Sequence, residues 1–151
     1  MSRKLRYDRE RLKALVRYVV GRRGAASDLA ELGNALWLAE ARQFVLHRTP
    51  ISGATYRRDP LGPAARGIRT VLSEIASADD IDRPPALSAK ERESAEWALR
   101  HLHDPACAAI WAKAEIGEVI PYHALLALRC RQPNADELAW AKLRAGEPAA
   151  Q

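Results

Sequence analysis

A stretch between residues 29 and 46 constrains this chain most, because it is apolar on nearly every side. Its apolar residues leave almost no polar face in the middle of the stretch: Leu29, Leu32, Ala35, Leu36, Leu38, Ala39, Ala41, Phe44 and Val45. A helix with this pattern is usually buried at the centre of its domain. We therefore expect a buried central helix over about 28–47, capped by Ser27 or Asp28. Glu40 lies inside it and needs a partner or a gap between neighbours, because an unpaired buried charge is costly.

Apolar residues recur at helical spacing in most other segments as well. The first such helix starts near Asp8, and the third starts from about Pro63. Ser88 followed by Glu91 is the pattern of a capping box. Further helix starts are expected at three places: Asp104-Pro105, Pro121 and Asn134. No strand of useful length is apparent, so the sequence predicts an all-α fold.

The expected organisation is one compact domain of six or seven helices around the central helix. A basic N-terminal tail over 1–7 precedes the domain at 8–145, and a flexible tail follows at 146–151. Three prolines and two glycines between residues 49 and 63 exclude regular helix there. They predict one rigid Pro/Gly loop over about 48–62. For Tyr56 in this loop two alternatives stay open: exposure as a binding residue, or packing inward in a loop that only joins two helices.

The net charge of +5 is distributed unevenly along the chain. Residues 1–23 hold nine Lys and Arg against Asp8 and Glu10, whereas the remainder is slightly acidic. Arg9, Lys13 and Arg17 recur every four residues and form a basic face, which could steer an acidic protein or a nucleic acid. A solvated helix face with a basic tail is the interpretation we favour, because stacking aromatic residues are sparse nearby.

No arrangement of residues predicts catalysis. His101 and His103 are two positions apart, which places them on different sides of a helix. Asp104-Pro105 interrupts a possible His103–Cys107 pair, and no CxxC, HExxH or phosphate-binding glycine motif occurs. We expect no enzyme activity, no metal and no cofactor. No apolar run reaches the ~20 residues of a membrane span, so we expect a cytoplasmic protein that does not contact a membrane.

Two separated motifs resemble the Panacea domain, the SocA-like antitoxin family, over roughly Asp8 to Arg129. The first motif combines four elements in order: Trp37-Leu38-Ala39-Glu40, Pro50-Ile51-Ser52-Gly53, Tyr56 and Pro60-Leu61-Gly62-Pro63. The second lies near the C-terminus: Trp111, Gly117, Ile120, Pro121 and Tyr122. Three positions depart from the family pattern, with Glu40 for the usual Asp, Gln43 for a frequent His and Leu61 for the turn tyrosine.

The resemblance implies an antitoxin that neutralises a cognate toxin protein by direct contact, as proteins of toxin-antitoxin systems do. In SocA-like members this extends to delivering the toxin to a ClpXP-type protease. The partner-binding residues expected here share a polar or aromatic side chain in or near the Pro/Gly loop: Glu40, Tyr56, Arg57, Arg58, Arg66 and Arg69. The alternative is a small basic nucleic-acid-binding regulator of phage or mobile-element origin, acting through the basic N-terminal helix.

Overall fold

The computed structural model describes residues 7–23, 28–76 and 87–130 of the 151-residue chain. Within these ranges it has six helices: α1 (Arg9–Arg23), α2 (Leu29–His47), α3 (Ile68–Ile75), α5 (Ala89–Arg100), α6 (Pro105–Ala112) and the 3-10 helix η1 (Tyr122–Cys130). Two short strands, β1 (Tyr56–Asp59) and β2 (Gly62–Ala65), complete the described part. The protein is therefore mostly helical, but it is not purely all-α.

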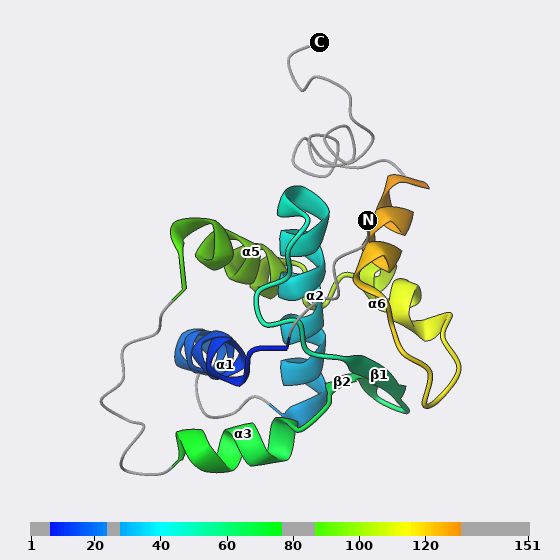
Figure 1. Cartoon of the computed structure of the whole chain (residues 1–151). Helices are drawn as coiled ribbons and strands as arrows, with labels where there is room; N and C mark the ends of the chain where they lie inside the picture. The colour runs from blue at the N-terminus through cyan, green and yellow to red at the C-terminus, as the bar shows by residue number, and fades with distance from the viewer. Residues whose placement is uncertain (1–6, 24–27, 77–86, 131–151) are drawn as a thin grey trace.

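Helix α2 is the centre of the fold, as its all-round apolar character predicts. It is buried throughout Leu32–Gln43, and Trp37 and Glu40 have no exposed surface. Asp28 caps it by accepting a hydrogen bond of 2.7 Å from the Glu31 amide. Figure 1 shows α2 upright, with α1 and α5 on one side and the two strands, α6 and η1 on the other.

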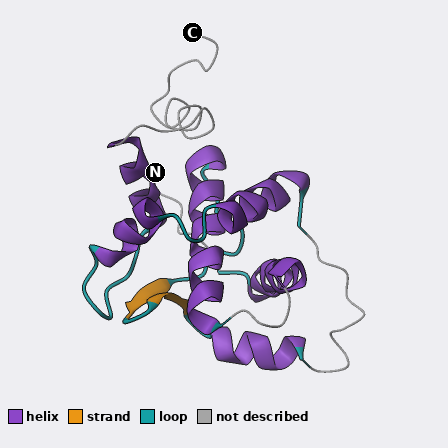
Figure 2. Ribbon diagram, turned by 180° about the vertical axis from the view of Figure 1, so that it is seen from behind, coloured by secondary structure: helices purple, strands orange, loops and turns teal. Residues whose placement is uncertain are grey.

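The two strands form an antiparallel hairpin in which Tyr56 lies opposite Ala65 and Asp59 lies opposite Gly62. The expectation that no strand occurs was wrong. Proline is compatible with this hairpin because Pro63 lies opposite Arg58, whose amide and carbonyl bond instead to residues 117 and 118. A proline at such a position removes no bond from the ladder. Figure 2 shows the hairpin packed beside one end of α2.

The third helix begins at Ile68 rather than near Pro63, because residues 62–65 belong to β2. Gly67 precedes it with φ of 78°, a left-handed conformation that glycine adopts without steric cost. The rigid loop expected over 48–62 is consequently shorter, since Tyr56 already begins a strand.

The backbones of β2 and α2 approach closely at Gly33, in the first turns of α2. A Cβ atom added at Gly33 would lie 1.9 Å from the carbonyl oxygen of Pro63. Only glycine permits this approach, so Gly33 sets how near the hairpin lies to the central helix.

The helix starts predicted at Ser88, Asp104-Pro105 and Pro121 agree with the structure. Ser88 and Glu91 form the complete capping box of α5, and Asp104 caps α6 with Pro105 in its first turn. The helix expected after Pro121 is the 3-10 helix η1. The helix expected from Asn134, the tail expected at 146–151 and all but Tyr7 of the tail expected at 1–7 lie outside the described residues. Of the helices that are described, none has the length and apolarity needed to cross a membrane.

Candidate functional site

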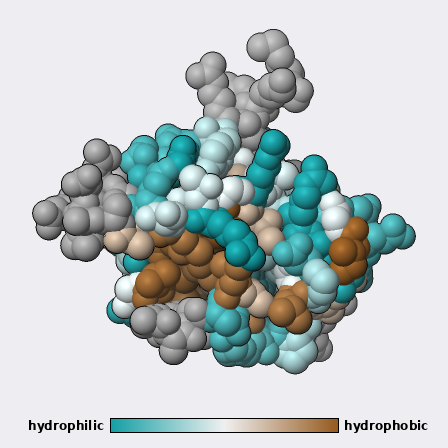
Figure 3. Space-filling view, turned by 90° about the horizontal axis from the view of Figure 1, so that it is seen from below, coloured by the Kyte–Doolittle hydropathy of each residue, from teal (hydrophilic) through white to brown (hydrophobic). Residues whose placement is uncertain are grey.

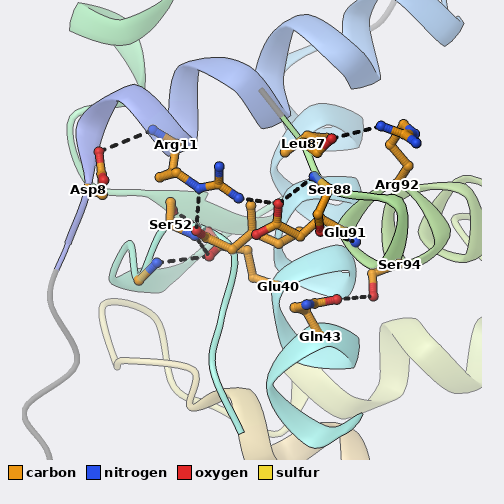
Figure 4. Close-up of polar contacts among 12 residues, drawn as sticks. Asp8, Arg11, Glu40, Gln43, Ser52, Leu87, Ser88, Glu91, Arg92 and Ser94 are labelled. Atoms are coloured by element: carbon orange, nitrogen blue, oxygen red, sulfur yellow. Dashed lines mark hydrogen bonds and ion pairs between the residues drawn. The ribbon is translucent and has the colours of Figure 1, made fainter. Parts of the chain in front are cut away.

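Glu40 is fully buried in α2, and its carboxylate accepts four hydrogen bonds from the segment that leads into β1. Oε1 accepts the Ser52 amide at 2.6 Å and the Gly53 amide at 3.0 Å. Oε2 accepts the Ser52 hydroxyl and the Tyr56 hydroxyl, both at 2.7 Å. We call Glu40, Ser52, Gly53 and Tyr56 the carboxylate cluster; Figure 4 shows the Glu40 side chain directed toward Ser52. The partner that Glu40 requires is thus the loop itself.

Burial dominates the ionisation of this cluster. It raises the pKa of Glu40 above its ordinary value, although the hydrogen bonds from Tyr56, Ser52 and Gly53 act in the opposite direction. Burial also raises the pKa of the Tyr56 hydroxyl well above its ordinary value, and the nearby Glu40 carboxyl raises it further. Tyr56 therefore remains a neutral hydrogen-bond donor at physiological pH.

A second polar group joins the same loop to α1 and α5. Arg11 of α1 forms an ion pair with Glu91 and places its Nε 3.5 Å from the Ile51 carbonyl oxygen. Burial alone would raise the pKa of Glu91, but the bonds from Arg11 and from the Ser88 amide outweigh it, so the pKa is lowered. Figure 4 shows this group beside the carboxylate cluster. The loop before β1 is thereby held by α2 through Glu40 and by α1 through Arg11, whose side chain Glu91 of α5 holds in place.

Tyr56 packs inward, which decides between the two alternatives that the sequence left open. Only 1% of its surface is exposed, and its ring packs edge-on against Tyr122. Glu40 and Tyr56 therefore cannot meet a partner protein directly in this conformation. Both residues position the hairpin instead.

Residues 117–120 lie along the free edge of β1 and extend the sheet by a short third segment. The Arg58 amide donates to Glu118, Gly117 donates back to Arg58, and Ile120 donates to the Tyr56 carbonyl. Arg57 forms an antiparallel bridge with Val119. The second motif of the sequence thus packs against the first.

The arginines of β1 differ in exposure. Half-buried Arg58 donates to the carbonyls of Ala112 and Ala114 at 3.1 and 2.6 Å, and its guanidinium lies over the Trp111 ring. Exposed Arg57 donates one bond of 2.9 Å to the Gly117 carbonyl. Arg58 therefore fixes the chain before η1, whereas Arg57 faces solvent.

Side chains alternate across the hairpin, so every second residue of β1 shares a face with its cross-strand partners. Arg57 pairs with Ala64 on one side and Val119 on the other, and the Arg66 amide bonds to Thr55, two residues before Arg57. The side chains that share the outward-facing side of the hairpin are therefore those of five residues: Thr55, Arg57, Ala64, Arg66 and Val119. We call these five residues the solvent face. Nearby, Leu61 at the hairpin turn is 77% exposed and Ile116 is 59% exposed. In Figure 3 the right-hand side, where Figure 1 has the hairpin, shows separate apolar spots among hydrophilic side chains.

The remaining predicted residues lie on two other elements. Arg66 and Arg69 are both exposed, but only Arg69 lies on α3, because Arg66 precedes its Gly67 cap. The interpretation of Arg9, Lys13 and Arg17 as a solvated face was wrong in part. Lys13 is only 6% exposed and lies 3.0 Å from Glu74 of α3, which also pairs with Arg9. Arg17 is half-buried. Lys13 also lies 3.5 Å from Glu10 of its own helix, and packing of α3 against α1 adds Glu74 as a second acid.

The histidine and cysteine candidates do not converge. Cys107 is buried in α6, whereas His103 is exposed and lies 3.4 Å from Glu31. Within the described ranges no group of three or more His, Cys, Asp and Glu residues could hold a metal ion.

Sequence reasoning missed two residues that matter for the site. Val119 sits in a loop by sequence and gives no strand signal, although Arg57 pairs with it. Tyr122 donates a hydrogen bond to the Ala54 carbonyl, and burial raises its pKa. The sequence signal that could have identified Tyr122 was its place in the second of the two Panacea-like motifs.

Fold and site together define a mostly helical domain in which a buried carboxylate holds a β-hairpin against the central helix, with one hairpin face left open to solvent. No protein-family model, no curated protein and no solved structure matches the chain.

Proposed function

We propose that this protein is a non-catalytic antitoxin that neutralises a cognate toxin by direct protein binding through the solvent face of the hairpin. The observation that carries the proposal is the exposure of aliphatic side chains beside this face on a backbone that the carboxylate cluster fixes. Leu61, Ile116 and Val119 are 77%, 59% and 46% exposed. The apolar groups near the hairpin are separate spots among polar side chains (Figure 3), so we expect each to act as a single apolar anchor within a largely polar contact.

A fixed hairpin makes such contacts efficient. Four hydrogen bonds tie the loop before β1 to Glu40, and Ile120 and Glu118 tie the neighbouring segment to β1. A surface already ordered before binding loses little conformational entropy, so a few apolar contacts contribute more than their area suggests.

The backbone at Val119 offers a second means of recognition. The Glu118 carbonyl and the Ile120 amide face β1, so the amide and carbonyl of Val119 between them point away from it. No described residue bonds to these two groups. An extended segment of a partner could pair with them, as in strand addition at sheet edges.

The resemblance to SocA-like antitoxins supports the proposal in a modified form. Its motif residues Glu40, Ser52 and Tyr56 bond to one another in the interior, so they support the hairpin rather than touch the toxin. Contact is assigned to Arg57 and to the exposed aliphatic residues around it, with Arg66 and Arg69 at the border.

The nucleic-acid alternative has less support. Arg9 and Lys13, two of the three residues of the basic face, share Glu74 in ion pairs, which lowers the positive charge available to phosphates. Binding of this kind should be weak, indifferent to sequence and lost steeply as salt rises.

The test is co-expression with the toxic product of a neighbouring reading frame, followed by pull-down and growth rescue. Val119→Asp and Arg57→Glu should each weaken toxin binding by at least ~10-fold, because they place charge in the contact or reverse it. Arg100→Glu is the matched control: it makes the same charge change on α5, on the other side of α2 (Figure 1). Folded hairpin variants that bind and rescue as well as the control would overturn the proposed surface.

Degradation distinguishes an inhibitor from a protease adaptor. If the protein also delivers its toxin, the toxin's half-life in cells should shorten when the protein and a ClpXP-type protease are both present. An unchanged half-life, with growth still rescued, would leave simple inhibition as the function.

A further inference from the structure

A pocket of about 350 Å³ opens between the start of α1, the end of the loop before β1 and the start of α3. We call it the α3 pocket, and among the described residues six line it: Tyr7, Arg9, Thr55, Arg66, Gly67 and Thr70. Its volume is at the lower end of the range of small-molecule sites, roughly 300–1,000 Å³.

The lining is rich in hydrogen-bond donors that no described residue uses. Tyr7, Thr55 and Thr70 bring three hydroxyl groups to the pocket, and Arg66 brings a guanidinium. None of these four side chains has a hydrogen bond or ion pair with another residue of the ranges 7–23, 28–76 and 87–130. Three neutral hydroxyls can donate to, or accept from, a ligand, whereas the guanidinium only donates.

The acids around the pocket are already engaged. Glu74 pairs with both Arg9 and Lys13. Asp8 accepts hydrogen bonds from the amides of Glu10 and Arg11 at 3.0 and 3.3 Å, which caps α1. The positive charge of Arg66 is therefore not neutralised by a described neighbour, and exposed Arg69 adds a second charge outside the lining.

We propose that the α3 pocket binds one oxyanion group, a carboxylate or a phosphate, carried by a small molecule. An arginine fork matches the paired oxygens of either group, and charge-assisted hydrogen bonds are stronger than neutral ones. The hydroxyls of Thr55, Thr70 and Tyr7 would donate to the free lone pairs of these two oxygens or, in a phosphate, to its other oxygens. The pocket shares Thr55 and Arg66 with the solvent face, but the residues assigned to the main toxin contact do not line it: Arg57, Leu61, Ile116 and Val119. A small-molecule oxyanion site there is a function separate from toxin binding.

The experiment titrates the full chain with inorganic phosphate, with succinate and with chloride at equal ionic strength. Calorimetry gives the affinity, and backbone amide chemical shifts of Gly67 and Thr70 locate the bound anion. We expect saturable binding of phosphate or succinate but not of chloride. Saturation by phosphate alone, or by succinate alone, identifies which oxyanion group the pocket accepts.

Variants distinguish a specific pocket from general positive charge. Arg66→Ala and Thr70→Val should each weaken binding by about 10-fold, the loss expected for one hydrogen bond to a charged group. Arg69→Ala is the matched control, since it removes a nearby charge in the first turn of α3 without altering the lining. It should weaken binding less than ~3-fold by screened electrostatics alone. Equal weakening by Arg66→Ala and Arg69→Ala, or no saturable shift at Gly67 and Thr70 with either oxyanion, would overturn the proposal. Melting temperatures of the variants verify that each remains folded.

Discussion

The two faces of the hairpin differ in what their polar groups contact. On the inner face the Tyr56 hydroxyl meets a buried carboxylate, and Arg58 donates to two backbone carbonyls. On the outer face Arg57 makes one exposed hydrogen bond, and Val119 beside it is 46% exposed. Adjacent residues of one strand thus have separate tasks: the inner face fixes the hairpin, and the outer face is free to contact another molecule.

This difference can be measured, because substitutions on the inner side should change stability and those on the outer side should change binding. Residues that hold the inner face to α2 are expected to have the largest effects.

Removing the carboxylate should have the largest effect. Glu40→Ala leaves two amides and two hydroxyls without their acceptor in a buried place, and it also opens a cavity, so we expect a loss of about 4 kcal/mol in unfolding free energy. Glu40→Gln keeps an oxygen for the amides of Ser52 and Gly53 and should lose only about 1 kcal/mol. Urea denaturation measures both. Equal losses would show that the missing carboxylate oxygen, and not the cavity, sets the cost, because Glu40→Gln opens no cavity.

A substitution that disturbs the close approach of the hairpin to α2 should cause the next largest loss of unfolding free energy. Gly33→Ala places a methyl group against the Pro63 carbonyl and forces the backbones apart, with an expected loss of about 2–3 kcal/mol. Gly21→Ala in α1 is the matched control, because a Cβ there meets nothing within 4 Å. That control should gain roughly 0.5–1 kcal/mol from helix propensity. A neutral Gly33→Ala would mean that the hairpin can move away from the helix freely.

A single hydroxyl tests the inner face alone. Tyr56→Phe removes one hydrogen bond to the Glu40 carboxyl and should lower the unfolding free energy by about 2 kcal/mol. Arg57→Ala, one residue along on the outer face, should change it by no more than about 0.5 kcal/mol. The comparison between the two faces fails if the two substitutions have similar effects on thermal or chemical unfolding.

The smallest expected effect is a pH dependence of the unfolding free energy that arises from Glu40. Its folded-state pKa is raised, so in the range above its ordinary value of 4.5 the folded protein binds more protons at this residue than the unfolded protein does. The contribution of Glu40 to stability therefore falls as pH rises through that range. The stability difference between the unmodified protein and Glu40→Gln should shift in favour of the unmodified protein as pH is lowered from 7 toward 5. A shift in the opposite direction would mean that the hydrogen bonds outweigh burial.

Sequence patterns predicted those structural features that depend on residues close together in the sequence. The buried α2 and the capping box at Ser88 follow from periodicity and from a four-residue pattern, and both agree with the structure. The need of Glu40 for a partner was also predicted. Its particular donors were not, because they depend on how the loop folds back.

Features that rest on distant contacts were missed. The strands of the hairpin have only four residues each and few β-branched side chains, and β1 pairs with Val119 from a remote loop. Lys13 looked solvated because Glu74, which pairs with it, lies on another helix. The α3 pocket likewise joins residues of three segments, so no local pattern could indicate it.

The carboxylate cluster also implies an order in which the molecule folds. Glu40 contacts Ser52 and Tyr56 across 12 and 16 positions, whereas Tyr122 reaches Ala54 across 68 and Trp37 reaches Ile120 across 83. Closing an 83-residue loop rather than a 12-residue loop costs about 1.7 kcal/mol more in chain entropy. We therefore expect the hairpin to dock on α2 before the segment around Ile120 joins it. In folding kinetics, Tyr56→Phe should then slow folding, with a φ-value well above that of Tyr122→Phe, which should mainly accelerate unfolding. Should the two φ-values coincide, both motifs would form in the same step.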